Sequence, residues 1–500
     1  MIHTTMFNVV DFGAVPDGSK LCTDSFNKVI NACAAAGGGT VYIPSGMFLT
    51  GPIHLKSNVS LHLDTGARVL FSSNKEDYPV IDSRWEGVER QVYCPQIFGS
   101  GLENIVISGQ GVLDGQGDYW WRLFHAKKLE YPRPRLLSFE DSRHIKIEGV
   151  SFVNSPSWTL NPIRCQDVTI HQVMIKNPPD SPNTDGINPE SCQNVHISNC
   201  HLDVGDDCIT LKSGSEKILN KVPCENITIS NCTMIHGHGG VVIGSEMSGD
   251  IRNVVISNCV FEGTDRGIRI KSRRGRGGVV EDIRADNLIM KDVICPFALY
   301  MFYQCGEGGA ERAVWDKGPY PVNETTPVYR RIHFSNVTAT AVNASAGFIY
   351  GLPEMPISEI SFDNVFVTMA ENATPGIPAM MSYLNPMKQE GLFCCNTKNI
   401  YINNVHIGGN QGPAFLIQKT ENLELTRCSA ELMDKDQPVI RLDQVIGALI
   451  HGCKIEKGME TFIELGGRQT QRIEIIGNSR FIQEEQIKLT DGAQSQAFHF

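Results

Sequence analysis

Several features that define other classes of protein are missing from this sequence. No apolar run approaches the roughly 18 residues that a membrane-spanning helix requires, and Met1–Phe7 shows neither the basic start nor the apolar stretch of a secretion signal. We therefore expect a soluble, cytoplasmic protein, unless a signal segment was trimmed from the chain. Charged residues make up only 20% of the sequence, which is too few for a disordered or coiled-coil chain.

Positive charge is also in short supply. The chain has 44 Lys and Arg residues against 55 Asp and Glu, a net charge of −11, which argues against general binding to nucleic acids or anionic membranes. Cysteine, in contrast, is plentiful at 16 residues. Cys200, Cys232 and Cys259 close equivalent copies of one repeated phrase, so we expect them to stack as small buried hydrophobic side chains and to remain thiols.

Clear helix signals are rare, and the first half of the sequence predicts only one helix, over residues 23–36. Thr23 or Asp24 can cap its start, its apolar residues share one face, and glycines 37–39 end it. An amphipathic helix ahead of a repeat array is typical of a cap that covers an otherwise open core. We therefore interpret residues 1–45 as an N-terminal cap.

What the chain does have is a repeated phrase of the form Ile-x-Ile-Ser-Asn-Cys. Its copies lie at 195–200, 227–232, 254–259, 332–337, 360–365 and 400–405. The alternation of apolar and polar residues predicts short strands. Asparagine at the following bend tolerates a left-handed backbone and can stack as a hydrogen-bonded ladder. Units of roughly 22–32 residues predict a right-handed parallel β-helix, an all-β fold, whereas a propeller would need a period of roughly 40–50 residues.

The repeats extend over most of the chain, so we predict a single β-helix domain over residues 1–500, with the coils in 46–500. Two stretches rich in Gly, Pro, Asn and Met interrupt the repeats, at 306–326 and 371–396. Insertions in a solenoid form loops on one face, often the binding face. We expect these two stretches to be walls of a cleft.

The polar residues that most suggest chemistry are three aspartates. Asp206 and Asp207 directly precede a predicted strand, and Asp185 lies about one coil earlier. Gly205 supplies a bend that would let two adjacent aspartates face one side, and one coil displaces the chain by only roughly 4.8 Å. Crowding raises the pKa of at least one carboxyl group, so the cluster could combine a general acid with a general base. Solvated turn residues and a calcium site are the alternatives.

Two further polar groups follow along the chain. His238 lies between glycines, which allow a ligand close to the backbone, and His236 raises the alternative of a zinc pair without an evident third ligand. A dense basic cluster over 266–276 includes Arg269 and Lys271, which alternate as on a strand and therefore share one face. These two residues could hold an anion, although a solvated face or a nucleic-acid patch would have a similar sequence.

Four motifs occur in order along the chain: Asn183-Thr184-Asp185, Gly205-Asp206-Asp207, Gly237-His238-Gly239 and Arg269-Ile270-Lys271. Together they resemble the polygalacturonases, family 28 of the glycoside hydrolases, and the segments 244–249 and 273–278 are most similar to the exo-acting bacterial members. The resemblance implies a right-handed parallel β-helix that cleaves α-1,4-linked galacturonic acid with inversion. It implies an oligogalacturonide or polygalacturonate substrate, release of galacturonate from the non-reducing end, and no metal, cofactor, nucleic-acid or membrane partner.

The same resemblance implies a role for each site residue. Asp206 corresponds to the general acid, and His238 to the histidine that supports it. Asp185 and Asp207 correspond to the pair that activates the attacking water. The carboxyl groups of an inverting enzyme are roughly 6.5–9.5 Å apart, which leaves room for that water. Six residues are implied in substrate binding, the first two of them through the substrate carboxylate: Arg269, Lys271, Asn183, Asn188, Tyr303 and Arg274.

Two positions depart from the family pattern. Many members have an aspartate where this chain has Asn188, which affects one subsite contact rather than the chemistry. Many secreted members bridge the cysteine after Asp-Asp, here Cys208, to a cysteine at the position of Met234. The absence of that partner agrees with a reducing compartment.

Other functions stay open at this point. Endo-polygalacturonase and rhamnogalacturonan or xylogalacturonan hydrolase are alternatives within the same class. A calcium-dependent pectate lyase is an alternative from another class, and it would need a cationic base and a calcium cluster. A non-catalytic carbohydrate-binding β-helix is a further alternative, and it would not need three aspartates together.

Overall fold

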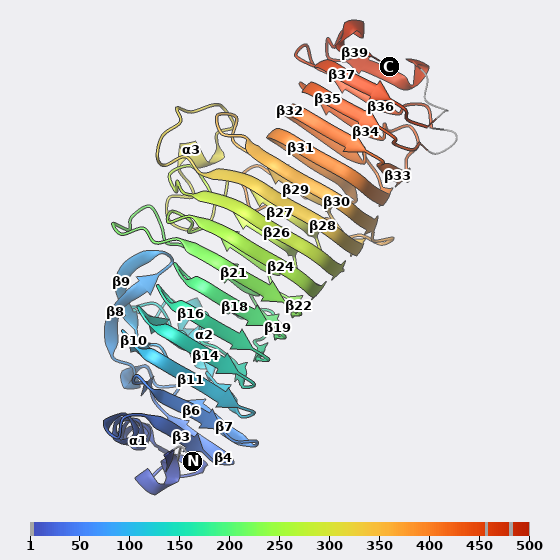
Figure 1. Cartoon of the computed structure of the whole chain (residues 1–500). Coiled ribbons are helices and arrows are strands. Elements are labelled where there is room, and N and C mark those ends of the chain that lie inside the picture. The colour runs from blue at the N-terminus through green and yellow to red at the C-terminus, as the bar shows by residue number, and fades with distance from the viewer. Residues whose placement is uncertain (1–4, 456–458, 480–483, 500) are drawn as a thin grey trace. The chain divides into compact units, whose positions relative to one another are not determined.

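The computed structural model describes residues 5–455, 459–479 and 484–499, and its regular structure is mostly parallel strand (Figure 1). The chain divides into two compact units, Met1–Val241 with Gly249–Val254 and Val242–Ser248 with Val255–Phe500. In each unit the strands pair in parallel with strands one coil further along the chain, as in a parallel β-helix, which confirms the all-β prediction. No helix in the described part of the chain is long and apolar enough to span a membrane.

The first helix, α1 (Thr23–Ala35), lies where the sequence predicts it. It packs against β3 (Gly39–Ile43), the first long strand after it. Its buried side chains include the three that share the predicted apolar face, Phe26, Ile30 and Cys33. Burial of this face against the start of the strand array is what stabilises the helix, because most helical stability in proteins comes from tertiary packing.

The predicted cap of α1 is wrong. The residue that precedes the first turn is Cys22, and no side chain accepts a hydrogen bond from the first turn there. Neither Thr23 nor Asp24 caps the helix, because both lie within it. The Thr23 hydroxyl instead accepts a hydrogen bond from the backbone N–H of Gly51, at 2.7 Å.

A second helix, α2 (Gly117–His125), is absent from the sequence-based prediction. It begins after Gln116, whose φ is 47° and whose side chain makes no cap, and its many aromatic residues have only modest helix propensity. The helix is held by tertiary contacts, since the Trp120 ring lies 5.1 Å from the Tyr78 ring and 5.5 Å from the Tyr93 ring. Packing between residues far apart in sequence overrides the weak local signal.

The core of the first unit is a stack of strands that brings apolar residues into register. Ile147 pairs with Ile170, and Ile170 pairs with Ile197. All three are buried, and burial stabilises the fold by about 1.5–3 kcal/mol for each such side chain. The rungs labelled in Figure 1 include β11 (Glu103–Gly109), β14 (Arg143–Glu148), β16 (Gln166–His171), β18 (Gln193–Ser198) and β21 (Cys224–Ser230).

A shorter stack in the first unit carries residues of chemical interest. Leu160 pairs in parallel with Ile187, and Ile187 pairs with Ile209, the first residue of β20 (Ile209–Leu211). These three side chains are fully buried. Because pairing in register aligns the residues on either side as well, this stack determines which polar side chains meet.

The second unit has the same pairing with longer strands. Its main rungs are β26 (Val279–Lys291), β28 (Val328–Val342), β30 (Ile357–Met369), β31 (Glu390–Asn410) and β32 (Phe415–Thr426) (Figure 1). Phe334 and Phe362 pair on neighbouring rungs, and their rings stack with centres 5.0 Å apart. Stacked apolar side chains therefore form the core of this unit too.

The two predicted interruptions of the repeat lie between strands of the second unit. The first insertion, residues 306–326, follows β27 (Cys295–Tyr300) and contains the short helix α3 (Arg312–Trp315) (Figure 1). The second insertion, residues 371–389, is shorter than predicted. The chain from Glu390 onward belongs to β31, where it pairs with neighbouring strands.

Asparagine occupies the bends of the coils, as predicted. Asn336, Asn364 and Asn404 have positive φ values of 53°, 55° and 51°. Asn364 donates a side-chain hydrogen bond to Asn336 at 2.7 Å, and Asn404 donates one to Asn364 at 3.1 Å, which confirms the predicted ladder. The cysteines that close three copies of the phrase are buried, also as predicted: Cys200, Cys232 and Cys259.

Candidate active site

Two of the three predicted aspartates lie side by side because of strand register. Ile187 and Ile209 are partners on neighbouring coils, and Asp185 and Asp207 each lie two residues before one of them. The backbone N–H of Gly186 donates to the carbonyl of Asp207 at 3.0 Å. Both carboxyl groups are buried, and adjacent coils are only roughly 4.8 Å apart. The stacking confirms that one coil separates these two residues.

Asp206 joins the same cluster through a bend. Its Oδ1 accepts a hydrogen bond from the backbone N–H of Asp207 at 2.9 Å, and one oxygen from each of the three aspartates lies within 4.8 Å of the others. Gly205 allows the chain to pass close to Ser181 just before the two aspartates, because a Cβ there would lie 2.5 Å from the carbonyl oxygen of Ser181. Two adjacent aspartates thus contribute to one cluster, as predicted.

The cluster raises the pKa of Asp185 well above its usual value. Burial is the largest cause, and the negative charges of Asp206 and Asp207 add to it. The positive charge of Lys212 and a hydrogen bond from Asn188 act in the opposite direction. The prediction that crowding raises at least one pKa is confirmed, at a residue to which the resemblance gives the role of a base. Interacting carboxyl groups titrate as a unit, so the proton belongs to the cluster.

The nearest oxygens of the three carboxyl groups are closer together than the separation expected between the two carboxyl groups of an inverting enzyme. The resemblance implies a separation of roughly 6.5–9.5 Å, whereas oxygens of all three aspartates lie within 4.8 Å of one another. Two features of the fold explain the short distances. Asp185 and Asp207 are in register on adjacent coils, which are about one strand spacing or roughly 4.8 Å apart, and Asp206 is the neighbour of Asp207 at a bend.

Asn188 contacts the aspartates directly. Its Nδ2 donates to Oδ2 of Asp185 at 3.0 Å, and its side chain is completely buried. Its Oδ1 has no hydrogen-bond partner among the described residues. The structure thus gives Asn188 a contact through which it stabilises the ionised form of Asp185, and its contact with substrate stays a prediction.

Arg133 is a further residue of the site, absent from the sequence-based candidates. Its Nη2 donates to Oδ1 of Asn183 at 2.6 Å, so it holds one of the predicted substrate-binding residues. Burial lowers the pKa of Arg133 to about 10, while the charges of Asp185 and Asp206 favour its protonated form. The paired arginines of the Arg-Pro-Arg segment over 133–135 are the sequence signal that points to it.

His238 lies beside Asp206 through its backbone. Its N–H donates to the carbonyl of Asp206 at 3.2 Å, and its side chain is exposed. Gly237 has a φ of 79°, and a Cβ there would lie 2.3 Å from the same carbonyl oxygen, so only glycine fits. The role of His238 in supporting the acid stays a prediction. The zinc alternative loses support, because in the described part of the chain the His, Cys, Asp and Glu groups close enough to share a metal are the three aspartates, and His236 is not among them.

The predicted cation pair lies in the second unit, on β25 (Arg266–Lys271). Arg269 is 1% exposed. Its Nε and Nη2 donate to the hydroxyl of Tyr300 at 3.1 and 2.8 Å, and its Nη2 also lies 2.8 Å from the sulfur of Met380. These contacts orient the guanidinium before any ligand binds.

Lys271 and Tyr303 lie close to the same arginine. The Lys271 Nζ is 5.3 Å from the centre of the Tyr303 ring, and the Arg269 Cζ is 5.9 Å from it. Burial raises the pKa of the Tyr303 phenol well above its usual value, although the charge of Arg269 opposes that shift. The structure brings these three predicted residues together. Two cations and a protonated phenol can bind a carboxylate by charge-assisted hydrogen bonds.

Arg274 occupies a different position from the cation pair. It donates to both carboxylate oxygens of Glu354, at 2.5 and 2.9 Å. It also donates to three backbone carbonyls of the first insertion, those of Ala313, Asp316 and Gly318. These hydrogen bonds anchor the first insertion, and the contact of Arg274 with substrate stays a prediction.

The three aspartates could also hold a cation. Their oxygens are close enough, and carboxylate oxygens are the ligands that calcium prefers. The donor set therefore fits the calcium of the lyase alternative. The raised pKa of Asp185 acts against this use, because a protonated carboxyl group is a poor metal ligand.

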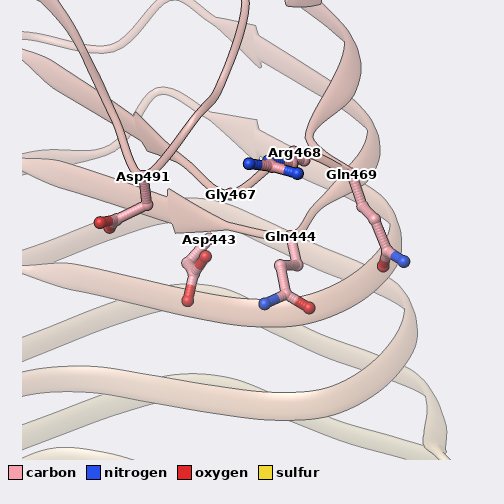
Figure 2. Close-up of a pocket in the computed structure, with 6 residues that line it drawn as sticks. All are labelled: Asp443, Gln444, Gly467, Arg468, Gln469 and Asp491. Carbon is pink, nitrogen blue, oxygen red and sulfur yellow. The ribbon is translucent and has the colours of Figure 1, made fainter.

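A separate polar depression lies on the turns of the last coils (Figure 2). Its volume is about 420 Å³, and its lining residues are Asp443, Gln444, Gly467, Arg468, Gln469 and Asp491. Figure 2 shows carboxylate, amide and guanidinium groups from successive turns around it. The lining contains no aromatic ring and none of the sequence motifs, so the aspartate cluster is the better candidate for an active site.

Comparison with known proteins agrees with this choice. The sequence profile of the Glycosyl hydrolases family 28 matches residues 33–382. A probable polygalacturonase of Vitis vinifera is 35% identical over 378 residues, which are 73% of this chain and 75% of that protein. An endo-polygalacturonase of Pectobacterium carotovorum subsp. carotovorum is 31% identical over 318 residues, 58% of this chain and 74% of that protein. The crystal structure of a hyperthermoactive exopolygalacturonase from Thermotoga maritima has a TM-score of 0.65 and 30% identity, and the match covers 80% of this chain and 92% of that one.

Proposed function

Because the chain belongs to glycosyl hydrolase family 28, the polygalacturonase family, we propose that it hydrolyses α-1,4 linkages between galacturonic acid units with inversion. We propose that it acts from the non-reducing end of an oligogalacturonide or polygalacturonate and releases galacturonate. The observation that carries the proposal is the cluster of Asp185, Asp206 and Asp207, whose oxygens lie within 4.8 Å of one another.

In the proposed reaction, Asp206 donates a proton to the glycosidic oxygen as the bond from that oxygen to the anomeric carbon breaks. Asp185 and Asp207 accept a proton from a water molecule, whose oxygen bonds to the anomeric carbon from the opposite face of the sugar. The proton taken from water replaces the one that Asp206 gave, so the cluster returns to its starting state. Arg269 and Lys271 of the second unit bind substrate carboxylates.

Retention of configuration is a second candidate, and the carboxyl spacing favours it. In retaining enzymes the two carboxyl groups are roughly 5–5.5 Å apart, and here one oxygen from each aspartate lies within 4.8 Å of the others. The presence of three carboxyl groups supports inversion instead, since two of them can hold the water while the third acts as the acid. Proton NMR of the first product distinguishes inversion from retention. An α linkage yields the β anomer by inversion and the α anomer by retention.

The variant Asp206→Asn tests the general-acid role. An amide cannot supply the carboxyl proton, so we expect the rate of hydrolysis to fall by roughly 10²- to 10⁴-fold without loss of the folded structure. Asp203→Asn is a matched control, because Asp203 is a partly buried aspartate of the same unit that contacts His236 outside the cluster. Near-normal turnover by Asp206→Asn would contradict the assignment.

The exo mode is supported by similarity to the Thermotoga maritima exopolygalacturonase, at 30% identity, and by the two insertions of the second unit. Chromatography of early products from trigalacturonate and polygalacturonate tests it. Monomer alone supports the exo mode, and mixed oligomers would show endo cleavage. Unsaturated products that absorb in the ultraviolet and vanish with a calcium chelator would show a lyase.

A further inference from the structure

Two aromatic side chains meet at the surface of the second unit, one from each insertion. Trp315 of α3 and Tyr383 of the second insertion contact edge to face, with ring centres 5.8 Å apart and ring planes at 90°. Tyr383 is 83% exposed, more than any other Phe, Tyr or Trp in the described chain. Its ring is therefore open to a ligand.

The backbone at Tyr383 adopts an unfavourable conformation. Its φ is 62°, and it is the only Phe, Tyr or Trp of the described residues with a positive φ. A β-carbon disfavours this left-handed region, which glycine and asparagine accept more readily. Such conformations in folded proteins concentrate at ligand-binding and active sites. The left-handed backbone therefore gives no local reason for a tyrosine at this position.

The residues just before Tyr383 are held in place. The backbone N–H of Gln304 donates to the carbonyl of Met380 at 3.1 Å. The hydroxyl of Ser382 donates to the side-chain oxygen of Gln304 at 2.9 Å. The tyrosine is thus presented from a segment with a defined conformation.

Trp315 is presented in a similar way by a buried arginine. The carbonyls of Ala313 and Asp316, on either side of Trp315, both accept hydrogen bonds from Nη1 of Arg274, at 2.8 and 2.7 Å. Glu354 holds the same guanidinium through both of its oxygens. Because the backbone that carries each ring is held before a ligand arrives, little conformational entropy of that backbone is lost on binding.

The segment that carries Tyr383 also reaches the cation pair. The sulfur of Met380 lies 2.8 Å from Nη2 of Arg269, and Met381 pairs with Tyr303 as an antiparallel bridge. Three residues of chain span at most about 11 Å between Cα atoms. A single oligosaccharide is therefore long enough to contact both Tyr383 and Arg269.

We propose that Trp315 and Tyr383 form an additional sugar-binding subsite that determines preference for chain length. The C–H face of a galacturonate ring stacks on the exposed Tyr383 ring, whose negative π face attracts C–H groups, while a carboxylate elsewhere on the same chain binds Arg269. This proposal rests on the proposed function. Only chains long enough to reach both places gain from the aromatic contact, so longer oligomers bind more tightly than short ones.

The test compares the Michaelis constants of di-, tri-, tetra- and pentagalacturonate. Tyr383→Asn removes the ring and places a residue that accepts the left-handed backbone, so the variant folds, with an unfolding temperature equal to or above that of the unaltered protein. We expect its KM for the longest oligomer to rise roughly three- to tenfold, with KM for the dimer and kcat unchanged. Tyr383→Phe keeps the ring and should keep every KM.

Trp315→Ala is an independent second variant, and it should raise KM for the same longer oligomers. Tyr401→Ala is the matched control, because Tyr401 is a 45% exposed tyrosine on β31 of the same unit, and it should change no KM. Unchanged constants at every length in Tyr383→Asn and Trp315→Ala would overturn the subsite, as would an equal rise at every length including the dimer. Failure of the unaltered protein to hydrolyse any oligogalacturonide would instead overturn the proposed function, and the subsite with it.

Discussion

The side-chain amide of Asn188 donates a hydrogen bond to Oδ2 of Asp185 at 3.0 Å, and both side chains are buried. The bond stabilises the ionised form of Asp185 and so opposes the burial and neighbouring charges that raise its pKa. One amide therefore limits how far the pKa of Asp185 rises.

Replacement of Asn188 should shift the pH dependence of hydrolysis. Asn188→Leu removes the donor at similar volume, so the pKa of Asp185 should rise further. If ionised Asp185 activates water, the acidic limb of the kcat/KM profile moves to higher pH by roughly one unit. Asn336→Ala, at an exposed asparagine of the ladder, should leave the profile unchanged. An unmoved limb in Asn188→Leu would show that the amide does not control Asp185.

Neutralisation of Asp185 should stabilise the fold while it removes activity. A carboxyl group whose pKa is raised by folding stabilises the protein below its unfolded pKa, and that contribution is lost as pH rises through the folded pKa. At neutral pH an aspartate in the unfolded chain is ionised, so the raised pKa of Asp185 lowers the stability of the folded state there. We expect Asp185→Asn to gain about 0.5–2 kcal/mol in free energy of unfolding at pH 7. Thermal unfolding at pH 7 and pH 4 checks this, since the gain should shrink at pH 4. An equal or lower unfolding temperature at pH 7 would refute it.

Removal of the Tyr300 hydroxyl should weaken substrate binding. Two hydrogen bonds from Arg269 end on that oxygen, so Tyr300→Phe frees the guanidinium to turn. We expect KM for galacturonate oligomers to rise roughly fivefold, with kcat nearly unchanged. Tyr78→Phe is the matched control, because the hydroxyl of that buried tyrosine of the first unit bonds the backbone carbonyl of Ser72. A similar KM in both variants would mean that the orientation of Arg269 does not depend on Tyr300.

Replacement of Lys317 should stabilise the protein in a pH-dependent way. Its Nζ lies 3.5 Å from the centre of the Phe302 ring and has no hydrogen-bond partner among the described residues. Burial and the charge of Arg274 lower its pKa from 10.5 to about 8. Between these two pH values the unfolded chain binds more protons, so stability rises with pH across the interval. Below pH 8 Lys317 is protonated in both states, and its buried ammonium group lowers the stability of the fold by the full amount there.

Lys317→Met should accordingly raise the unfolding temperature below pH 8, and the advantage should shrink as pH approaches 10.5. Scanning calorimetry at several pH values measures this difference. Lys398→Met removes an exposed lysine paired with Glu421 and should show no such trend. A constant difference at all pH values would indicate a packing effect without a contribution from ionisation.

Much of the fold could be predicted because its signals are local. Apolar and polar residues alternate around Ile170, and this pattern by itself predicts a strand with one buried face. The left-handed bend at Asn336 needs only a residue that tolerates positive φ, and the structure has a φ of 53° there. Repetition of such signals is sufficient to indicate a stack of coils.

Other features depend on residues far apart in the chain. Helix α2 has a weak local pattern and forms around Trp120, which packs against Tyr78 and Tyr93. The cap of α1 differs from the prediction because Thr23 bonds Gly51, on a later strand. Neither contact is visible in a sequence window around the residue concerned.

The sequence by itself determined which reactive groups the protein has and that about one coil separates Asp185 from Asp206 and Asp207. Only the tertiary structure decided how they meet. The pairing of Ile187 with Ile209 puts two of the aspartates in register, and the bend before Asp207 brings Asp206 to them, so that oxygens of all three lie within 4.8 Å. The physical reason is that side-chain chemistry is a property of each residue, whereas register, burial and the resulting pKa shifts arise from hydrogen bonds and packing between coils.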